Sequence, residues 1–351
     1  MRKILTILLV LMLALSMAAC GNNDPAPPPP PPSDENGEVV DTGETFVITA
    51  AHSHQLGMSV HYFFVYFQEE IERLSNGRIE MNIFPAGQLG GDADLTTAVQ
   101  AGDVTMMGAN INPHSMFMPD LAIFDIQFVH ESLEGARRVI SDPALLARIA
   151  QIYAADGFHH LGFTDSSFRY ITANFPIHTP ADMQGLTIRS SANNFHVANW
   201  QAIGANPTPL PIGEVYISLQ QGVVDAQDNP IEHNLLFVFY EQQTHFMESN
   251  HFFHVNTYIM CPVFYNSLPA DLQAAVDQAA ATAVQRTQAH HDANMQAQID
   301  YLKDNGITFI QLTPDEMAQF AALVGPAWEL IEEAVSAETF RIFFEAVERA
   351  R

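Results

Sequence analysis

Basic residues are scarce in this 351-residue chain, which has 14 Lys and Arg against 40 Asp and Glu and a formal net charge of −26. Proteins that bind nucleic acid or anionic membrane surfaces draw on clustered Lys and Arg. The longest basic run here is the pair Arg137-Arg138. The composition therefore argues against a nucleic-acid partner.

Cysteine and the common catalytic signatures are also lacking. Two Cys are too few for a disulfide-framed fold. The sequence has no Gly-x-Ser-x-Gly elbow, no Walker phosphate loop and no paired Cys-x-x-Cys spacing. Hydrophobic residues nevertheless make up 48% of the chain, enough for a large core and about two domains. We expect Cys261 to be a buried, apolar member of a core strand.

The amino end has the pattern of an export signal. Arg2 and Lys3 precede an apolar stretch from Ile4 to Leu15, and Ala18-Ala19 stand directly before Cys20. The stretch is too short to span a bilayer comfortably. We expect residues 1–20 to be a lipoprotein signal, with Cys20 lipidated. Cleavage by the ordinary signal peptidase is the alternative.

A proline-rich segment follows at residues 21–44. It contains the unbroken run Pro27 to Pro32 in acidic, Asn-rich surroundings. This composition favours extended polyproline II structure and offers too little apolar surface to fold. We expect a disordered tether that holds a folded body away from a membrane, outside the cytoplasm.

Strand-like and helix-like segments alternate from residue 45 onward. We expect strands at Thr45–Ala51, Arg78–Phe84, Val104–Ala109, Phe158–Phe163, Phe168–Thr172, Leu186–Arg189 and Phe252–Tyr265. We expect helices at Ser59–Leu74, Asp92–Gln100, Leu133–Ile140, Pro143–Ala155, Asn194–Ile203, Gly213–Gln221 and Pro269–Lys303. This order predicts an α/β fold.

Two isolated arginines are the most informative charges. Residues 149–285 contain eleven Asp or Glu but only two cations, Arg169 and Arg189. Both lie in or at the end of a predicted strand, where an α/β sheet forms its crevice. A guanidinium there suits a carboxylate, because it can bind both oxygens in parallel hydrogen bonds. Alternatively, each Arg forms a structural ion pair with an internal Asp or Glu.

Polar side chains follow these arginines. Asn193 is suited to hydrogen bonding and to capping the predicted helix that begins at Asn194. Asn229 precedes Pro230, which keeps it extended, so its amide can face a ligand. An ordinary Asn-Pro turn is the alternative.

Several motifs occur in a fixed order, and together they carry a family resemblance. They are Pro85-Ala86-Gly87-Gln88-Leu89-Gly90, Val99-Gln100-Ala101-Gly102, Gly185-Leu186-Thr187-Ile188-Arg189, Gly204-Ala205-Asn206-Pro207-Thr208-Pro209, Gly213-Glu214-Val215-Tyr216, Leu219-Gln220-Gln221-Gly222-Val223-Val224-Asp225 and Asn229-Pro230. This ordered set resembles the substrate-binding proteins of tripartite ATP-independent periplasmic (TRAP) transporters.

The resemblance implies a two-lobed periplasmic-binding-protein fold of the second type, with lobes joined by hinge strands and a long helix. We expect lobe I at residues 45–166 plus 255–294, and lobe II at 167–254 plus 295–351. Such a protein closes over a small organic acid, for example a C4-dicarboxylate or a sugar acid. It then delivers the acid to membrane subunits driven by an ion gradient. It is not an enzyme and needs no cofactor.

The resemblance also implies roles for individual residues. Arg189 pairs with the substrate carboxylate, Arg169 adds to the same anion site, and Asn229 completes the clamp. The remaining expected ligand contacts are His52, His54, Gln55, Asp92 and Asn193. Asp92, like Asp94, is explained equally well as a residue at the start of a helix.

A metal-dependent hydrolase is the rival interpretation. His52-Ser53-His54 has the His-x-His form of such enzymes, and His61 could add an imidazole. A barrel enzyme would need eight strand and helix units, with ligands where this sequence offers arginines. We expect His159-His160 and His290-His291 to be exposed pairs. A ligand-sensing protein that presents its closed form to a receptor would share the predicted acid site.

Overall fold

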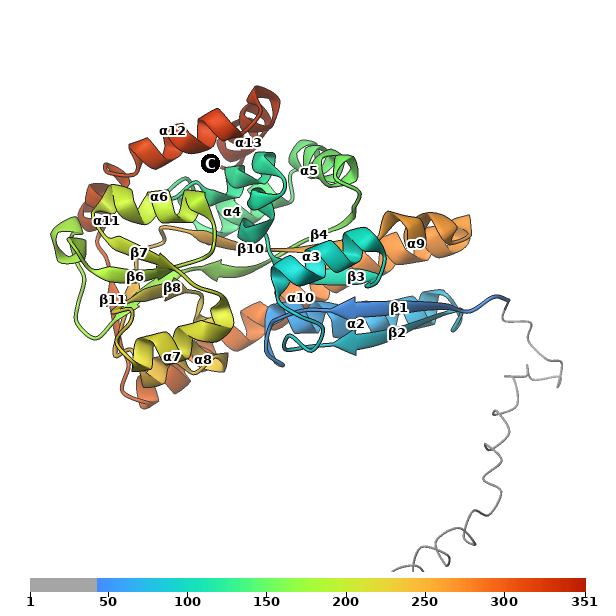
Figure 1. Cartoon of the computed structure of the whole chain (residues 1–351), viewed down its shortest axis with the longest axis horizontal. Coiled ribbons are helices and arrows are strands. Elements are labelled where there is room, and N and C mark those ends of the chain that lie inside the picture. Colours follow the sequence, from blue (N-terminus) through green and yellow to red (C-terminus); the bar gives the residue numbers. More distant parts are fainter. Residues whose placement is uncertain (1–42) are drawn as a thin grey trace, which may run out of the picture. The chain divides into compact units, whose positions relative to one another are not determined.

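In the computed structural model, residues 43–351 are described. The predicted signal at 1–20 with Cys20, and the predicted tether except its last two residues, lie outside the described residues. Glu44–Arg351 form one contact unit. Its strands fall into three sheets of five, four and two strands (Figure 1).

The five-stranded sheet has the order β2-β1-β3-β10-β4. Its strands are β1 (Phe46–Ala51), β2 (Ile79–Phe84), β3 (Met106–Asn110), β4 (His159–Phe168) and β10 (Phe253–Met260). β1 is parallel to β2 and β3, whereas β10 is antiparallel to β3 and β4. The carboxyl end of β1, where His52 follows, therefore lies at the same edge as those of β2 and β3.

The four-stranded sheet has the order β11-β9-β5-β8. Its strands are β5 (Tyr170–Ala173), β8 (Gln227–Asn229), β9 (His245–Glu248) and β11 (Thr308–Gln311). A separate parallel pair consists of β6 (Thr187–Ser190) and β7 (Asn206–Pro209), and a bridge joins Ile188 to Ala226 just before β8. This bridge brings the strand that carries Arg189 beside the strand that carries Asn229.

The chain crosses between the two larger sheets at Arg169. β4 ends at Phe168 and β5 begins at Tyr170, so only Arg169 separates the two strands. Ser167, just before the crossing, has a positive φ of 67°. The chain returns through the short connection between β9 and β10.

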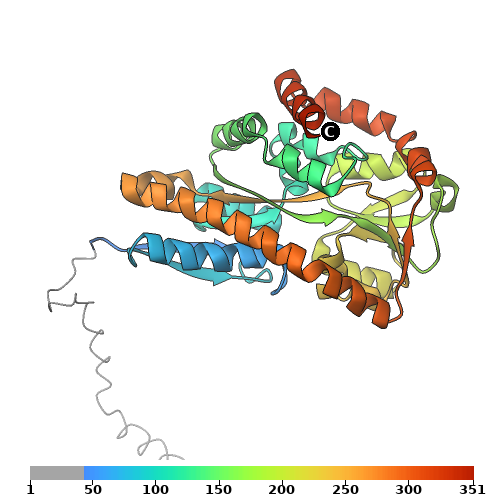
Figure 2. The ribbon, with the colours of Figure 1, turned by 180° about the vertical axis from the view of Figure 1, so that it is seen from behind.

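The 35-residue helix α10 (Ala270–Asp304) packs against α2 (Ser59–Leu74), β4 and α8 (Ile231–Leu236). Figure 2, seen from behind, shows it running diagonally in front of the strands. Crossing strands and a long helix are the predicted connections between lobes.

Local sequence signals explain where several helices begin. Asp142 accepts hydrogen bonds from Ala144 N and Leu145 N at the start of α5 (Pro143–Ala155), and Pro143 occupies its first turn. Ser132 caps α4 (Leu133–Ile140) through Gly135 N. The remaining α-helices are α3 (Asp92–Ala101), α6 (Asn194–Ile203), α7 (Val215–Gln220), α9 (Pro262–Ser267), α11 (Pro314–Ala321), α12 (Gly325–Ala334) and α13 (Ala337–Ala350).

Large apolar side chains hold α2 and α10 on the five-stranded sheet. Phe63, Phe64 and Phe67 of α2 are fully buried, and the Phe63 ring stacks on Tyr258 of β10 with centroids 3.5 Å apart. Burying a side chain of this size contributes about 1.5–3 kcal/mol. This core fixes the beginning of α2, next to the loop that carries His52.

Most predicted elements are confirmed, with three differences. The strand predicted at Phe252–Tyr265 is wrong beyond Met260, because Pro262 begins α9 instead. The strand predicted at Phe168–Thr172 starts at Tyr170, since Phe168 belongs to β4. Cys261 is buried as predicted, but it follows β10 and precedes α9.

Candidate functional site

Arg169 is an ion-paired arginine at the crossing between the sheets. It is 3% exposed. Its Nε donates to the Asp228 carboxylate at 2.5 Å, its Nη2 donates to the Asp228 carbonyl, and its Nη1 lies 2.9 Å from His254 Nδ1. Burial disfavours the charged form of Asp228, but Arg169 and His196 hold its pKa well below the usual value. The structural alternative thus applies to this arginine.

Arg189 is equally buried, at 5% exposure, but has a different partner. Its Nε and Nη2 both donate to the carbonyl of Leu210, at 3.0 and 2.7 Å. Within residues 43–351, no carboxylate oxygen lies within 4.0 Å of its guanidinium. Burial lowers its pKa to about 10, and the Arg169 charge contributes, while the Asp228 charge opposes the shift. Arg189 therefore carries a buried charge that forms no ion pair of its own among residues 43–351 and is only partly offset by the more distant Asp228.

Asn229 lies beside the Arg169 ion pair. It faces Tyr170 in the β5–β8 register and directly follows Asp228. Its Nδ2 donates to Gln227 Oε1 at 2.6 Å, and its backbone carbonyl accepts from Asn234 Nδ2. These bonds fix the amide in one orientation within the second sheet. The structure thus brings Asn229 and Arg169 together with Asp228. The sequence predicted that Asn229 and Arg169 share one site, but it did not include Asp228.

Asn193 caps α6, as predicted. Its Oδ1 accepts from Phe195 N at 2.7 Å and His196 N at 3.2 Å. Its Nδ2 donates to Ser115 Oγ and to Asp125 Oδ2, both at 2.9 Å. Burial raises the pKa of Asp125 to about 7. The Asn193 amide thus links α6 to the segment before α4, and its predicted contact with a ligand stays a prediction.

The loop after β1 is held by the Pro85-Ala86-Gly87 motif. Gly87 N donates to the His52 carbonyl and Ala86 N donates to the His54 carbonyl, both at 3.0 Å. Both imidazoles are buried, and burial lowers the pKa of each, that of His52 to about 3. The two rings are therefore uncharged at neutral pH.

The other predicted residues of this loop region have separate contacts. Ser53 Oγ donates to Asp92 Oδ1 at 2.6 Å, which joins the loop to the first residue of α3. Asp94 instead accepts from Gly91 N in the capping box of that helix. The carbonyl of half-buried Gln55 accepts from Met58 N at 3.3 Å.

Sequence reasoning missed two imidazoles that connect this loop to Arg169. The ring of His233, from α8, lies 5.6 Å from the His54 ring and 4.7 Å from the His254 ring. His254 in turn contacts Arg169. No sequence signal marked these residues, because each is a single His inside a short helix or a buried strand.

Glu232 was also missed. It is buried in α8 and accepts from Ser59 N at 3.1 Å and Ser59 Oγ at 2.7 Å, at the amino end of α2. His291 Nδ1 lies 3.7 Å away. Despite burial, the Glu232 carboxylate raises the pKa of His291. The prediction that His159-His160 and His290-His291 are exposed pairs is wrong, because His291 is 3% exposed and the other three are half-buried.

Two further features are absent from residues 43–351. Within this part of the chain, no three His, Cys, Asp or Glu side chains are arranged to hold a metal ion. Among the same residues, no helix combines the length and apolar character needed to cross a bilayer.

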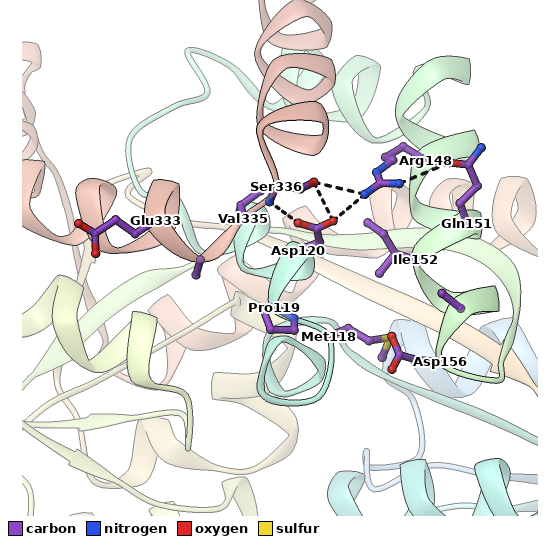
Figure 3. A pocket seen from close by; sticks show the side chains of 12 residues that line it. Met118, Pro119, Asp120, Arg148, Gln151, Ile152, Asp156, Glu333, Val335 and Ser336 are labelled. Atoms are coloured by element: carbon purple, nitrogen blue, oxygen red, sulfur yellow. Dashed lines mark hydrogen bonds and ion pairs between the residues drawn. The ribbon is translucent and has the colours of Figure 1, made fainter.

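A cavity of about 450 Å³ lies away from the predicted site residues (Figure 3). Its lining includes Arg148, Asp120 and Ser336. Arg148 and Asp120 form an ion pair at 2.7 Å. None of the predicted site residues lines this cavity.

Known proteins resemble this chain over most of its length. Residues 50–334 match the family described as bacterial extracellular solute-binding protein, family 7. The C4-dicarboxylate-binding periplasmic protein DctP of Rhodobacter capsulatus is 28% identical over 275 residues, which are 78% of this chain and 82% of the relative. A solute-binding protein of Roseobacter denitrificans is 31% identical over 72% of this chain and 77% of its own length.

A solved structure agrees with these relatives. A TRAP periplasmic solute-binding protein from Ochrobactrum anthropi is 27% identical and has a TM-score of 0.80, over 87% of this chain and 96% of its own. This likeness confirms the predicted α/β periplasmic-binding-protein fold and the TRAP resemblance. It also favours transport over the metal-dependent hydrolase. By sequence and by fold, the chain belongs to the family 7 bacterial extracellular solute-binding proteins.

Proposed function

We propose that this protein captures a small organic acid between two lobes, with the acid group paired to Arg189. The observation that carries the proposal is the buried guanidinium of Arg189, which forms no ion pair among residues 43–351. An unpaired buried charge is costly, and a ligand carboxylate would remove that cost. Carboxylates also match the planar donor fork of Arg.

Arg169 and Asn229 have supporting roles in this proposal. Arg169 and Arg189 are close enough that each charge affects the other, while Asp228 neutralises the first. One positive charge therefore remains for the ligand. Asn229, held beside Asp228, completes the acid-binding end.

Lobe closure is supported by contacts that join the two predicted lobes, residues 45–166 plus 255–294 and 167–254 plus 295–351. Glu232 of the second lobe accepts hydrogen bonds from Ser59 of the first. Asn193 of the second donates to Asp125 of the first. A ligand that touches both lobes would stabilise a closed arrangement of them.

The closed, loaded protein would deliver its acid to TRAP membrane subunits outside the cytoplasm, without changing it chemically. The Rhodobacter relative is named as a C4-dicarboxylate-binding protein, which supports an organic acid. A lipid on Cys20 would hold the protein at the membrane. Micromolar binding corresponds to about 8 kcal/mol, and charge-assisted hydrogen bonds contribute about 1.5–3 kcal/mol each, so a few contacts suffice.

Native mass spectrometry of gently purified protein would identify a retained acid. Titration calorimetry with that acid should show at least tenfold weaker binding to Arg189→Lys, because Lys cannot form the planar fork. Arg286→Lys is the control, since Arg286 pairs with Glu69 on the surface. Equal affinities for Arg189→Lys and the wild type would remove Arg189 from the site.

A further inference from the structure

A continuous row of imidazoles leads from Arg169 to the loop after β1. The ring centroids of His254 and His233 are 4.7 Å apart, and those of His233 and His54 are 5.6 Å apart. The row continues to His52 at 6.4 Å. These residues come from both predicted lobes, so the row crosses between them.

Three nitrogens of this row have no hydrogen-bond partner among residues 43–351. They are Nδ1 of His52, His54 and His233, whose residues are 0%, 4% and 2% exposed. Buried polar atoms are nearly always hydrogen-bonded. An uncharged imidazole offers one donor and one acceptor. Hydroxyl groups can both donate and accept, so they match such a set without any change of charge.

The charges around the row do not suit an anion. Burial lowers the pKa of His52, His54 and His233, so the rings are neutral at pH 7. Asp92 contacts Ser53 in the middle of the loop. Glu232 Oε1 lies 3.9 Å from His233 Nδ1. A second carboxylate placed here would face two carboxylates, and the nearby His291 is already paired with Glu232.

We propose that these histidines form a subsite for hydroxyl groups, so that the ligand is a monocarboxylate with a hydroxylated tail, such as a sugar acid. This inference rests on the proposed function and narrows its ligand class. The charge balance at the other end agrees with it, because two guanidiniums and Asp228 leave one charge for one carboxylate. A C4-dicarboxylate would leave its second charge unpaired.

Titration calorimetry on the wild-type protein with three six-carbon acids tests the proposal. Gluconate has one carboxylate and five hydroxyls, glucarate replaces the terminal CH2OH with a second carboxylate, and hexanoate has no hydroxyl. Gluconate should bind at least tenfold more tightly than either of the others. Glucarate or hexanoate binding as tightly as gluconate, or no binding by any of the three, would overturn the subsite.

Variants separate the subsite from the acid-binding end. His54→Phe and His233→Phe keep a planar ring but remove the nitrogens, and each should weaken gluconate binding at least tenfold while leaving hexanoate binding unchanged. His159→Phe is the control, because His159 stacks on Tyr265 at the edge of the five-stranded sheet. Unaltered gluconate affinity in both variants contradicts the inference. The proposed function fails separately, if Arg189→Lys binds the retained acid as the wild type does.

Discussion

Arg169 and Arg189 are the same residue type at nearly the same burial, yet their surroundings differ. Arg169 has an internal carboxylate at 2.5 Å, whereas within residues 43–351 the side chain of Arg189 hydrogen-bonds only to the carbonyl of Leu210. A paired buried arginine is explained by the protein alone. An unpaired one needs an external anion, or it costs stability. The difference indicates that Arg169 is held by the protein itself, and it supports the binding role that we propose for Arg189.

Breaking the Arg169 pair should give the largest effect. Asp228→Asn leaves the Arg169 guanidinium buried without a counter-charge, which destabilises proteins by about 3–5 kcal/mol. Urea denaturation should show this loss. Asp292→Asn is the matched control, because Asp292 pairs with Arg137 at the surface, where such pairs contribute about 0–1 kcal/mol. Equal losses in the two variants would remove the structural role of the Arg169 pair.

Replacing Arg189 by an apolar side chain of similar length should have a small effect on stability and a large effect on acid binding. Arg189→Met removes a buried charge that forms no ion pair among the described residues, so the free energy of unfolding should fall by only about 1–3 kcal/mol, the cost of leaving the Leu210 carbonyl unpaired. Acid binding should weaken at least a hundredfold, about 2.7 kcal/mol.

Arg169→Met provides the comparison for Arg189→Met. It leaves Asp228 buried and unpaired, so it should destabilise the protein strongly. Denaturation and calorimetry on both variants measure the contrast. If Arg189→Met were the less stable of the two, the assignment of roles would be reversed.

The sequence identified both arginines, because they are the only cations between residues 149 and 285. It could not tell which was paired. Asp228 is 59 residues from Arg169, and the contact depends on pairing between β5 and the three-residue strand β8. So short a strand carries almost no periodic signal. The sequence therefore could not identify ion-pair partners that long-range strand pairing brings together.

The same reasoning separates features that only tertiary contacts define from features that a local motif marks. His233 and His254 come together only through packing of α8 against β10, so no local pattern marks them. In contrast, Thr313-Pro314 with Glu316 forms a capping box at α11, a local signal that does predict a helix start. Elements defined by local caps were within reach of the sequence, and tertiary clusters were not.

Glu232 is a second buried carboxylate that the protein itself stabilises. Asp228 is paired with Arg169, whereas Glu232 accepts hydrogen bonds from hydroxyl and backbone donors and lies beside His291. Burial disfavours the charged form, yet His291 and Ser166 lower the pKa of Glu232 to about 2, below its usual 4.5. A depressed carboxyl pKa gives stability that is complete above pH 4.5 and is lost as the pH falls towards 2.

We therefore expect the wild type to lose stability more steeply between pH 5 and pH 3 than Glu232→Gln, in urea denaturation midpoints measured across that range. Glu332→Gln, at an exposed position of α12, is the control, and its urea midpoints should change with pH as those of the wild type do. The charge at Glu232 acts on the amino end of α2, where an acceptor for Ser59 N also favours the helix dipole. If the urea midpoints of the wild type and Glu232→Gln changed equally with pH, the charge of Glu232 would add no stability, and neutral hydrogen bonds alone would join α8 to α2.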